Sequence, residues 1–314
     1  MHTSEDLLVR VKIALADIKF NKQPNKLYEP ITYTFSLGGK RIRPVLVLMA
    51  CDMFGGDVEM AINPAIAIEI FHNFTLLHDD IMDNAPIRRS KETVFKKWNS
   101  NVAILSGDTM FALAYKYLIK TKEKNINKIL EIFTQAAIEV CEGQQYDMDF
   151  ETRKDVSESE YIEMIRLKTA VLIATSLKTG AVIAGASEKD VETIYKFGEC
   201  VGIAFQLQDD LLDVYGDQDK FGKQIGGDIV TNKKTYLYIK ALQSAQRGAK
   251  NKDIEALELY FSSVNFNSEE KIKAVTNIYD NLSVKEFTTS LINEYYNNAL
   301  VYLSDLSVND DRKK

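Results

Sequence analysis

Proline is missing from most of this 314-residue chain. All five prolines lie in the first 86 positions: Pro24, Pro30, Pro44, Pro64 and Pro86. Proline removes a backbone donor and disrupts helix interiors, so the chain after residue 86 lacks the residue that most opposes long helices. The sequence therefore favours long helices over the rest of its length.

Cysteine and histidine are also scarce. The chain has three of each, namely Cys51, Cys141, Cys200, His2, His72 and His78. The cysteines are widely spaced and form no CxxC pair, which excludes a disulfide scaffold and a thiolate metal site. Three histidines are too few to favour a Ser-His-Asp triad or a histidine-rich zinc site.

Positive charge is not in excess, because the formal net charge is −6. This excludes a nucleic-acid surface built on excess positive charge, so any anion site must be local. The first twenty residues mix charges into their apolar positions and lack a signal-peptide core, and no later segment is expected to be long and apolar enough to span a bilayer. We therefore expect a cytoplasmic protein without a membrane span.

Apolar residues recur at helical spacing along the whole chain. They predict helices near residues 4–20, 44–54, 57–83, 101–120, 125–150, 158–186, 188–214, 233–248, 252–263, 268–281 and 284–305. No strand-length alternation and no low-complexity linker interrupts them. We expect one all-α domain over residues 1–314, with interior helices wrapped by peripheral ones and a charged C-terminal tail that frays.

Two acidic clusters share one spacing: Asp79, Asp80 and Asp83, and Asp209, Asp210 and Asp213. Helix residues three and four apart share a face, so each cluster directs its carboxylates toward one point. The segments before both clusters are strongly apolar, which argues against the alternative of a merely solvated helix end. Acid near a helix C-terminus also opposes the helix dipole. Oxygen-only ligands of this kind favour magnesium.

Basic residues accompany both clusters. Lys40, Arg41 and Arg43 follow a glycine pair, Arg88 and Arg89 follow the first acidic cluster, and Lys220, Lys223, Lys233 and Lys234 surround the end of the second. Any single pair could be a solvated surface charge of little consequence. Carboxylates that bind metal, together with arginine and lysine side chains, are what a diphosphate requires.

Four segments together resemble the trans-isoprenyl diphosphate synthases. They are GGKRIRP at 38–44, DDIMDNAPIRR at 79–89, EGQQYDMDF at 142–150 and GIAFQLQDDLLDVYGD at 202–217. The resemblance covers about residues 38–235, with the segments in the family's order. It implies the all-α isoprenoid synthase fold, a homodimer, and a magnesium-dependent prenyltransferase whose substrates are isopentenyl diphosphate and dimethylallyl, geranyl or farnesyl diphosphate.

The resemblance also implies roles for individual residues. Several magnesium ions would be held, together with the allylic diphosphate, by Asp79, Asp80, Asp83, Asp209, Asp210 and Asp213. The allylic diphosphate would contact Arg88, Lys168, Lys223 and Lys233. Isopentenyl diphosphate would contact Lys40, Arg43, His72 and Arg89. The reacting carbons would be lined by Lys168, Thr169 and Gln206.

The same resemblance bears on product length. In the family, an aromatic residue beside the first acidic motif limits products to short chains, such as farnesyl or geranylgeranyl diphosphate. Phe74, with the smaller Thr75 beside it and Phe71 further round the helix, resembles the twenty-carbon pattern slightly more than the fifteen-carbon one. The alternative for Phe74 is ordinary packing in the core.

Other activities stay open at this point. A longer-chain polyprenyl synthase would share every motif named above. A noncatalytic partner subunit of a heteromeric synthase would often have lost acidic ligands, but both clusters are intact here. A terpene cyclase would need neither GGKRIRP nor the second acidic cluster.

Overall fold

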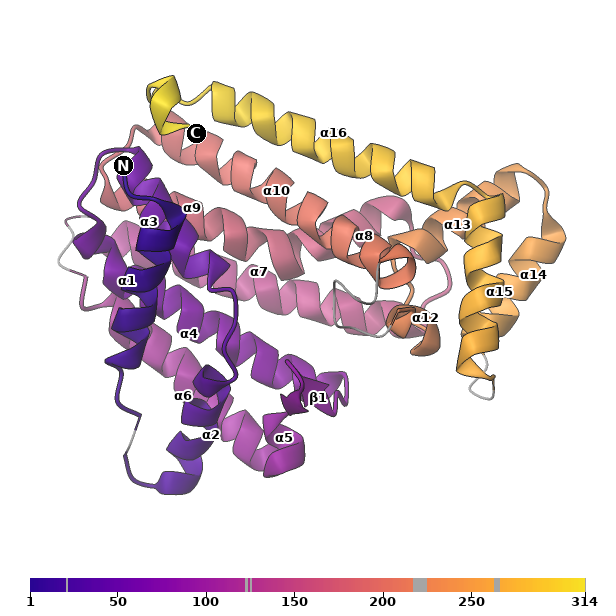
Figure 1. Cartoon of the computed structure of the whole chain (residues 1–314), viewed down its shortest axis with the longest axis horizontal. Helices are drawn as coiled ribbons and strands as arrows, with labels where there is room; N and C mark the ends of the chain where they lie inside the picture. Colours follow the sequence, from indigo (N-terminus) through magenta and orange to yellow (C-terminus); the bar gives the residue numbers. More distant parts are fainter. Residues whose placement is uncertain (21, 122–123, 125, 217–224, 263–265, 314) are drawn as a thin grey trace. The chain divides into compact units, whose positions relative to one another are not determined.

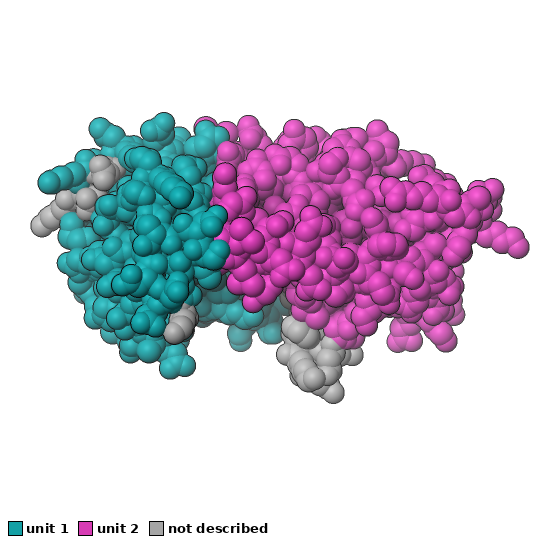
Figure 2. All heavy atoms as spheres, turned by 90° about the horizontal axis from the view of Figure 1, so that it is seen from above, with its two compact units in different colours: residues 1–136, 172–195, 303–314 teal, residues 137–171, 196–302 magenta. Residues whose placement is uncertain are grey.

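The computed structural model describes the whole chain except residues 21, 122–123, 125, 217–224, 263–265 and 314. Contacts divide the chain into two compact units, coloured separately in Figure 2. Unit 1 contains residues 1–136, 172–195 and 303–314, and unit 2 contains residues 137–171 and 196–302. Every point at which the chain passes from one unit to the other falls inside a helix, so the division does not coincide with a linker between domains. The single domain expected over residues 1–314 stays a prediction.

Unit 1 is helical apart from one small hairpin (Figure 1). Its complete helices are α1 (Ser4–Ala16), α2 (Asn25–Ser36), α3 (Ile42–Met53), α4 (Val58–Met82), α5 (Val94–Lys97) and α6 (Ser100–Leu118). It also holds the start of α7 (Ile126–Thr152), most of α9 (Val171–Ile183), the start of α10 (Glu188–Tyr215) and the short turn η2 (Asp310–Arg312). The hairpin pairs β1 (Ile87–Arg88) with β2 (Lys91–Glu92) in antiparallel register. Neither α2 nor this hairpin was predicted.

Helix α4 corresponds to the apolar helix that the sequence predicts over residues 57–83. Its side chains are buried on nearly all sides, among them Ile68, Ile70 and Phe71, each fully excluded from solvent. It packs most extensively against α6 and α3. By length and composition α4 could cross a membrane, so the expectation that no segment could do so was wrong. Its apolar residues face other helices, with 61% of the most apolar stretch buried, as in the core helix of a soluble protein.

The two ends of the chain are held to the same place in unit 1. The backbone N–H of His2 donates to Asp52 Oδ2 at 2.6 Å, and the guanidinium of Arg312 donates to the Asp52 carbonyl at 2.8 Å. Ser307 donates from its backbone N–H to Asp190 Oδ1 at 2.9 Å. Of the charged tail that is expected to fray, Arg312 is thus hydrogen-bonded to the body of unit 1, and the fraying itself stays a prediction.

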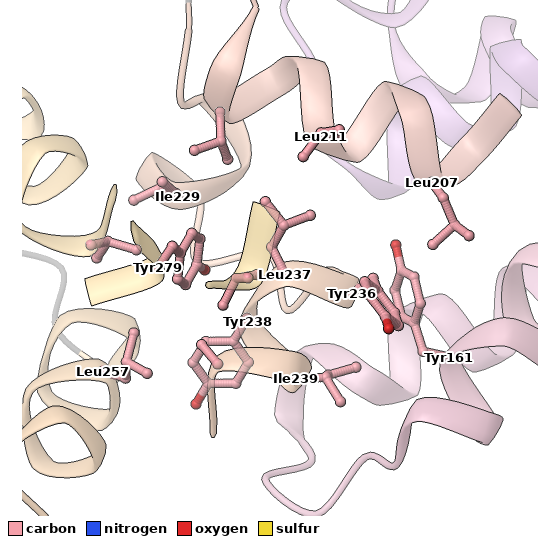
Figure 3. Packing of buried hydrophobic residues seen from close by; sticks show 14 of the residues in the cluster. Tyr161, Leu207, Leu211, Ile229, Tyr236, Leu237, Tyr238, Ile239, Leu257 and Tyr279 are labelled. Carbon is pink, nitrogen blue, oxygen red and sulfur yellow. The ribbon is translucent and has the colours of Figure 1, made fainter. Parts of the chain in front are cut away.

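Unit 2 contains the remaining helices. They are the end of α7, α8 (Glu158–Ile165), η1 (Arg166–Ala170), the rest of α10, α12 (Gly227–Val230), α13 (Tyr236–Arg247), α14 (Asn251–Ser262), α15 (Ser268–Asn281) and most of α16 (Val284–Ser304). Figure 3 shows their shared core, in which Leu207 and Leu211 of α10 lie among side chains such as Tyr236 and Tyr279. The predicted all-α fold is confirmed.

The helix expected over residues 158–186 is interrupted. Residues Arg166–Ala170 form a π-helical turn, η1, between α8 and α9. Such turns are rare and are frequent at functional sites. This turn contains Lys168 and Thr169, two of the residues predicted to line the reaction site.

Candidate functional site

The loop before α3 places a run of basic residues around a pocket. Gly38 and Gly39 have φ of 77° and 135°, which a residue with a side chain rarely adopts. Arg41 is also left-handed, with φ of 53°, and α3 begins at the next residue. The buried Arg41 side chain pairs with Glu69 of α4 and donates to the Phe35 carbonyl at 3.1 Å. Arg41 therefore holds the loop against α4.

The pocket beside this loop has a volume of about 530 Å³. Its lining includes all four residues predicted to bind isopentenyl diphosphate: Lys40, Arg43, His72 and Arg89. Arg43 Nη1 and His72 Nε2 lie 3.3 Å apart, which fixes the two side chains with respect to each other. The structure thus brings together four residues that the sequence spreads over fifty positions.

The charges of this pocket follow from burial. Burial lowers the pKa of Arg43 to about 10, partly opposed by Glu69, so the guanidinium stays protonated at neutral pH. Burial, and next the neighbouring Arg43, lower the pKa of His72 well below its usual value, so the imidazole is neutral. The pocket is therefore cationic through lysine and arginine, and it is suited to an anion.

The β1–β2 hairpin directs two adjacent arginines to different partners. Arg88 Nε donates to Asp80 Oδ1 at 2.7 Å, and its Nη2 donates to Asp79 Oδ2 at 3.3 Å. Arg89, left-handed with φ of 52°, instead donates to the Gly38 carbonyl. One arginine thus contacts the first acidic cluster and the other contacts the cationic pocket.

The first acidic cluster ends α4, as predicted. Asp79 and Asp80 lie in its last turn and Asp83 is its C-cap. Asp80 is 3% exposed, and this burial raises its pKa to about 6 although the Arg88 guanidinium acts in the opposite direction. A carboxylate kept in such a place without a function would be a net cost.

One turn back along α4, aromatic side chains gather. Phe71 and Phe74 have ring centroids 5.5 Å apart, and each also contacts Phe111 of α6. Phe71 contacts Phe133 of α7 at 5.2 Å. Thr75 donates its hydroxyl to the His72 carbonyl at 2.8 Å. Phe71 is fully buried, whereas Phe74 is only partly buried.

In unit 2, two predicted lysines share one carboxylate. Lys168 Nζ donates to Asp147 Oδ2 at 2.6 Å, and Lys233 Nζ lies 3.6 Å from the same oxygen. Burial acts to raise the pKa of Asp147, but Lys233 and Lys168 outweigh it and the pKa is lowered. Asp147 was not predicted as a site residue, although it belongs to the EGQQYDMDF segment that carries the resemblance.

A chain of hydrogen bonds joins Thr169 to the second acidic cluster. Thr169 Oγ1 donates to Gln206 Oε1 at 3.2 Å, and Gln206 Nε2 donates to Asp210 Oδ1 at 3.0 Å. Tyr161, which the sequence reasoning missed, donates its hydroxyl to Asp210 Oδ2 at 2.6 Å. Burial raises the pKa of Asp210 to about 6 despite these two donors. Asp210, like Asp80, is the buried member of its cluster.

A further acidic residue, Asp228, lies beside the second cluster. The backbone N–H of Asp228 donates to Asp213 Oδ2 at 3.0 Å. Burial, and then the charge of Asp213, raise the pKa of Asp228 to about 7. Nothing in the sequence distinguished Asp228, an isolated acid in a glycine-rich stretch. Lys223, predicted to contact the allylic diphosphate, lies outside the described residues.

Two glycines allow other helices to approach η1 closely. A Cβ on Gly143 of α7 would lie 2.3 Å from the backbone nitrogen of Lys168. A Cβ on Gly202 of α10 would lie 2.4 Å from Cα of Ala170. Both glycines therefore fix the backbone of the π-helical turn that presents Lys168 and Thr169.

We expect Gly143→Ala to lower both stability and turnover. The added methyl would meet backbone atoms that cannot rotate away, so the free energy of unfolding should fall by about 1–3 kcal/mol and Lys168 should be displaced. Thermal unfolding and steady-state kinetics test this, with Gln145→Ala, an exposed position on the same helix, as the matched control. Unchanged kcat and stability in Gly143→Ala would contradict the close approach.

The acidic clusters offer oxygen donors for a metal ion but no complete site of their own among the described residues. Within the described ranges, no three carboxylate, histidine or cysteine side chains lie close enough to hold an ion by themselves. Magnesium is commonly bound by one or two carboxylates completed by water and substrate phosphates, and not by an all-protein cage. The oxygen-only donors of both clusters fit that mode of binding.

A helical fold with a cationic pocket and paired acidic clusters is typical of an enzyme that handles diphosphates. The chain matches the family described as "Polyprenyl synthetase" over residues 24–279. It therefore belongs to the polyprenyl synthetase family and has the isoprenoid synthase fold.

Several characterised proteins are similar to the chain over most of its length. It is 35% identical to a short chain isoprenyl diphosphate synthase of Methanothermobacter thermautotrophicus, covering 97% of this chain and 90% of that protein. It is 39% identical to a geranylgeranyl diphosphate synthase of Sulfolobus acidocaldarius, covering 91% and 86%. A crystal structure of a geranylgeranyl pyrophosphate synthase superposes with a TM-score of 0.93 at 43% identity, covering 100% of this chain and 95% of that one.

Proposed function

We propose that this protein condenses isopentenyl diphosphate head-to-tail with allylic diphosphates and releases geranylgeranyl diphosphate as its main product. The observation that carries the proposal is the cationic pocket of unit 1. It gathers Lys40, Arg43, His72 and Arg89, the four residues expected to contact isopentenyl diphosphate. The relatives named above, which synthesise short-chain or geranylgeranyl diphosphates, support the product class.

The side chains of this pocket can bind a diphosphate without the help of a metal ion. Arginine offers planar pairs of N–H donors that match phosphate oxygens, and lysine adds a compact charge. Arg41 contributes little net charge because Glu69 neutralises it. Neutral His72 can donate one hydrogen bond without adding to the repulsion among the cations.

The allylic diphosphate is proposed to bind the lysines of unit 2. Lys168 and Lys233 already meet at Asp147, so their ammonium groups lie close enough to be shared by one anion. Their positive charge would stabilise the departing diphosphate as the allylic C–O bond breaks. The role of Arg88 at that diphosphate stays a prediction, since its described partners are Asp79 and Asp80.

Magnesium is the proposed cofactor. The residues that would hold it, together with diphosphate oxygens, are the six aspartates of the two clusters: Asp79, Asp80, Asp83, Asp209, Asp210 and Asp213. When bound, it would neutralise the negative charge that develops on the leaving diphosphate. The middle aspartate of each cluster is buried and hydrogen-bonded, Asp80 to Arg88 and Asp210 to Tyr161 and Gln206, so each would be held in a fixed orientation toward the metal.

The remaining steps of the proposed reaction are formation of the new carbon–carbon bond and loss of a proton. The double bond of isopentenyl diphosphate attacks the allylic cation, and the new carbocation loses a proton to the released diphosphate. Thr169 and Gln206, joined at 3.2 Å, present oxygen atoms whose partial negative charge can stabilise cationic carbon. Water must be kept out because it would quench either cation.

The aromatic cluster on α4 is proposed to limit the product. Phe74 is partly buried and supported by Phe71 and Phe111, so it is held in place as a wall. A chain that grows along α4 away from Asp79 would meet this ring, and Phe71 lies behind it. Because Phe71 is fully buried, we propose Phe74 as the residue that limits the chain first.

We expect Phe74→Ala to lengthen the product by at least one five-carbon unit, because removing the ring opens space along α4. Chromatography of the dephosphorylated products measures this directly. Phe133→Leu, a change in the same cluster behind Phe71, serves as the control and should leave the main product at twenty carbons. An unchanged product from Phe74→Ala would reject Phe74 as the limit and leave it a core residue.

The proposal is tested by incubating the purified protein with dimethylallyl diphosphate and radiolabelled isopentenyl diphosphate. Label should enter a longer prenyl diphosphate in the presence of Mg²⁺, and EDTA should abolish the reaction. Absence of any elongated product would favour a noncatalytic partner subunit, whereas products beyond twenty-five carbons would favour a long-chain synthase. Sedimentation in the same buffer tests the expected homodimer.

A further inference from the structure

A lysine in the core of unit 2 has no carboxylate partner among the residues that the structure describes. Lys271 of α15 is 3% exposed, and its ammonium donates to Oδ1 of Asn232. It also lies over the Phe261 ring, 5.3 Å from the centroid. Among the described residues, no aspartate or glutamate forms an ion pair with Lys271, and burial lowers its pKa. A buried cation of this kind costs stability, so an apolar residue would be expected unless the charge has a use.

The partner of Lys271 lies at a turn directly before a site residue. Asn232 follows α12 in the left-handed conformation, with φ of 63°, and its backbone N–H donates to the Ile229 carbonyl at 3.2 Å. Asparagine is one of the few residues that adopt this conformation readily. The next residue is Lys233, whose ammonium lies 3.6 Å from Asp147. The direction of Lys233 therefore depends on how the Asn232 turn is held.

The segment around this turn is fixed on two other sides. Its start is bonded to the second acidic cluster, since Gly226 donates to the Asp213 carbonyl at 2.6 Å. Its end is bonded to the last turn of α7, since Lys234 Nζ donates to the Glu151 carbonyl at 2.9 Å. Between them, the Lys233 backbone donates to the Asp228 carbonyl at 2.8 Å. Lys271 supplies the third attachment, from α15.

We propose that Lys271 is a positioning residue for allylic-diphosphate binding, because it holds the Asn232 turn from which Lys233 extends to the site. Helix α15 thereby takes part in substrate affinity although Lys271 itself touches no substrate. This inference rests on the proposed function of Lys233.

The test is Lys271→Met, which keeps the length and apolar stem of the side chain and removes the ammonium. With farnesyl diphosphate as the allylic substrate, KM for farnesyl diphosphate should rise roughly tenfold, the effect of weakening one charge-assisted contact. KM for isopentenyl diphosphate should not change, because the described residues that line its proposed pocket all lie between positions 37 and 89. Thermal stability should stay the same or rise, since a buried charge is removed.

Two further variants separate positioning from packing. Asn232→Gly keeps the left-handed turn accessible and removes the acceptor, so it should reproduce the rise in KM for farnesyl diphosphate. In a Lys233→Met background, Lys271→Met should add no further rise, because the group that it positions is gone. Lys273→Met, an exposed lysine on the same helix, is the control and should behave as the parent protein.

The results of these experiments distinguish a positioning role of Lys271 from a purely structural role. A rise in both KM values together, a lower melting temperature, or an undiminished effect in the Lys233→Met background would show that Lys271 is a structural residue and overturn the proposal. If Lys271→Met fails to fold, normal KM values in Asn232→Gly would overturn it instead. Failure of the proposed function itself would be seen separately, as a parent protein that forms no product.

Discussion

Replacing Asp79 by asparagine should lower kcat on the order of a thousandfold while the protein stays folded. The change removes a negative charge from the first acidic cluster, and loss of metal assistance at a leaving diphosphate costs several kcal/mol of transition-state stabilisation. Asparagine keeps the size of the side chain, and the core of α4 lies further back along the helix. The measurement is steady-state turnover across a range of Mg²⁺ concentrations, combined with thermal unfolding.

The matched control for Asp79→Asn is Glu59→Gln at the other end of α4. Glu59 is exposed and pairs with Arg10, so its loss should change kcat little. Near-normal turnover of Asp79→Asn at every Mg²⁺ concentration would reject the first cluster as a metal site. A matching loss of activity in both variants would point instead to a general effect of charge.

Replacing Arg43 by methionine should raise KM for isopentenyl diphosphate about a hundredfold, because one guanidinium can form two charge-assisted hydrogen bonds to a diphosphate. Arg43 lines the cationic pocket beside His72, and its positive charge persists at neutral pH because its pKa stays about 10. KM for the allylic substrate should change far less. Initial rates measured while each substrate is varied in turn give the two values.

Arg247→Met is the control for this change, since Arg247 is exposed at the end of α13 in unit 2. It should leave both KM values unchanged. A comparable rise in both KM values for Arg43→Met would mean that the pocket does not discriminate between the substrates. An unchanged KM for isopentenyl diphosphate would move its proposed site elsewhere.

Periodicity predicted most of the helices because long amphipathic or fully apolar segments leave few other ways to bury their residues. Helix α4 is the strongest case, since its apolar residues on every side required other helices around it. The π-helical turn η1 was missed because it depends on the close approach of Gly143 and Gly202 from other helices. Such an approach leaves no periodic signal in the segment itself.

The site was predictable where its residues form runs with a recognisable resemblance. Lys40, Arg43, His72 and Arg89 were named together from the sequence, and they line one pocket. The resemblance distinguished Arg43 from Arg41, and the structure adds a physical difference between them. Both line the pocket, but Arg43 lies beside His72, whereas Arg41 is neutralised by a glutamate on α4.

Isolated residues that act through contacts distant in sequence were missed. Asp228 is recognisable only by its hydrogen bond to Asp213, and Tyr161 only by its hydrogen bond to Asp210. Lys271 resembles any other lysine of an amphipathic helix until its burial is seen. A charged residue of this kind gives no signal by spacing, because its partner is set by tertiary packing.

The most direct test of the proposed function is the carbon count of the product. The purified protein is incubated with farnesyl diphosphate, labelled isopentenyl diphosphate and Mg²⁺, and the products are dephosphorylated and separated by chromatography. A main product of twenty carbons, geranylgeraniol, is the predicted result. No elongated product, or a main product of twenty-five carbons or more, would contradict it.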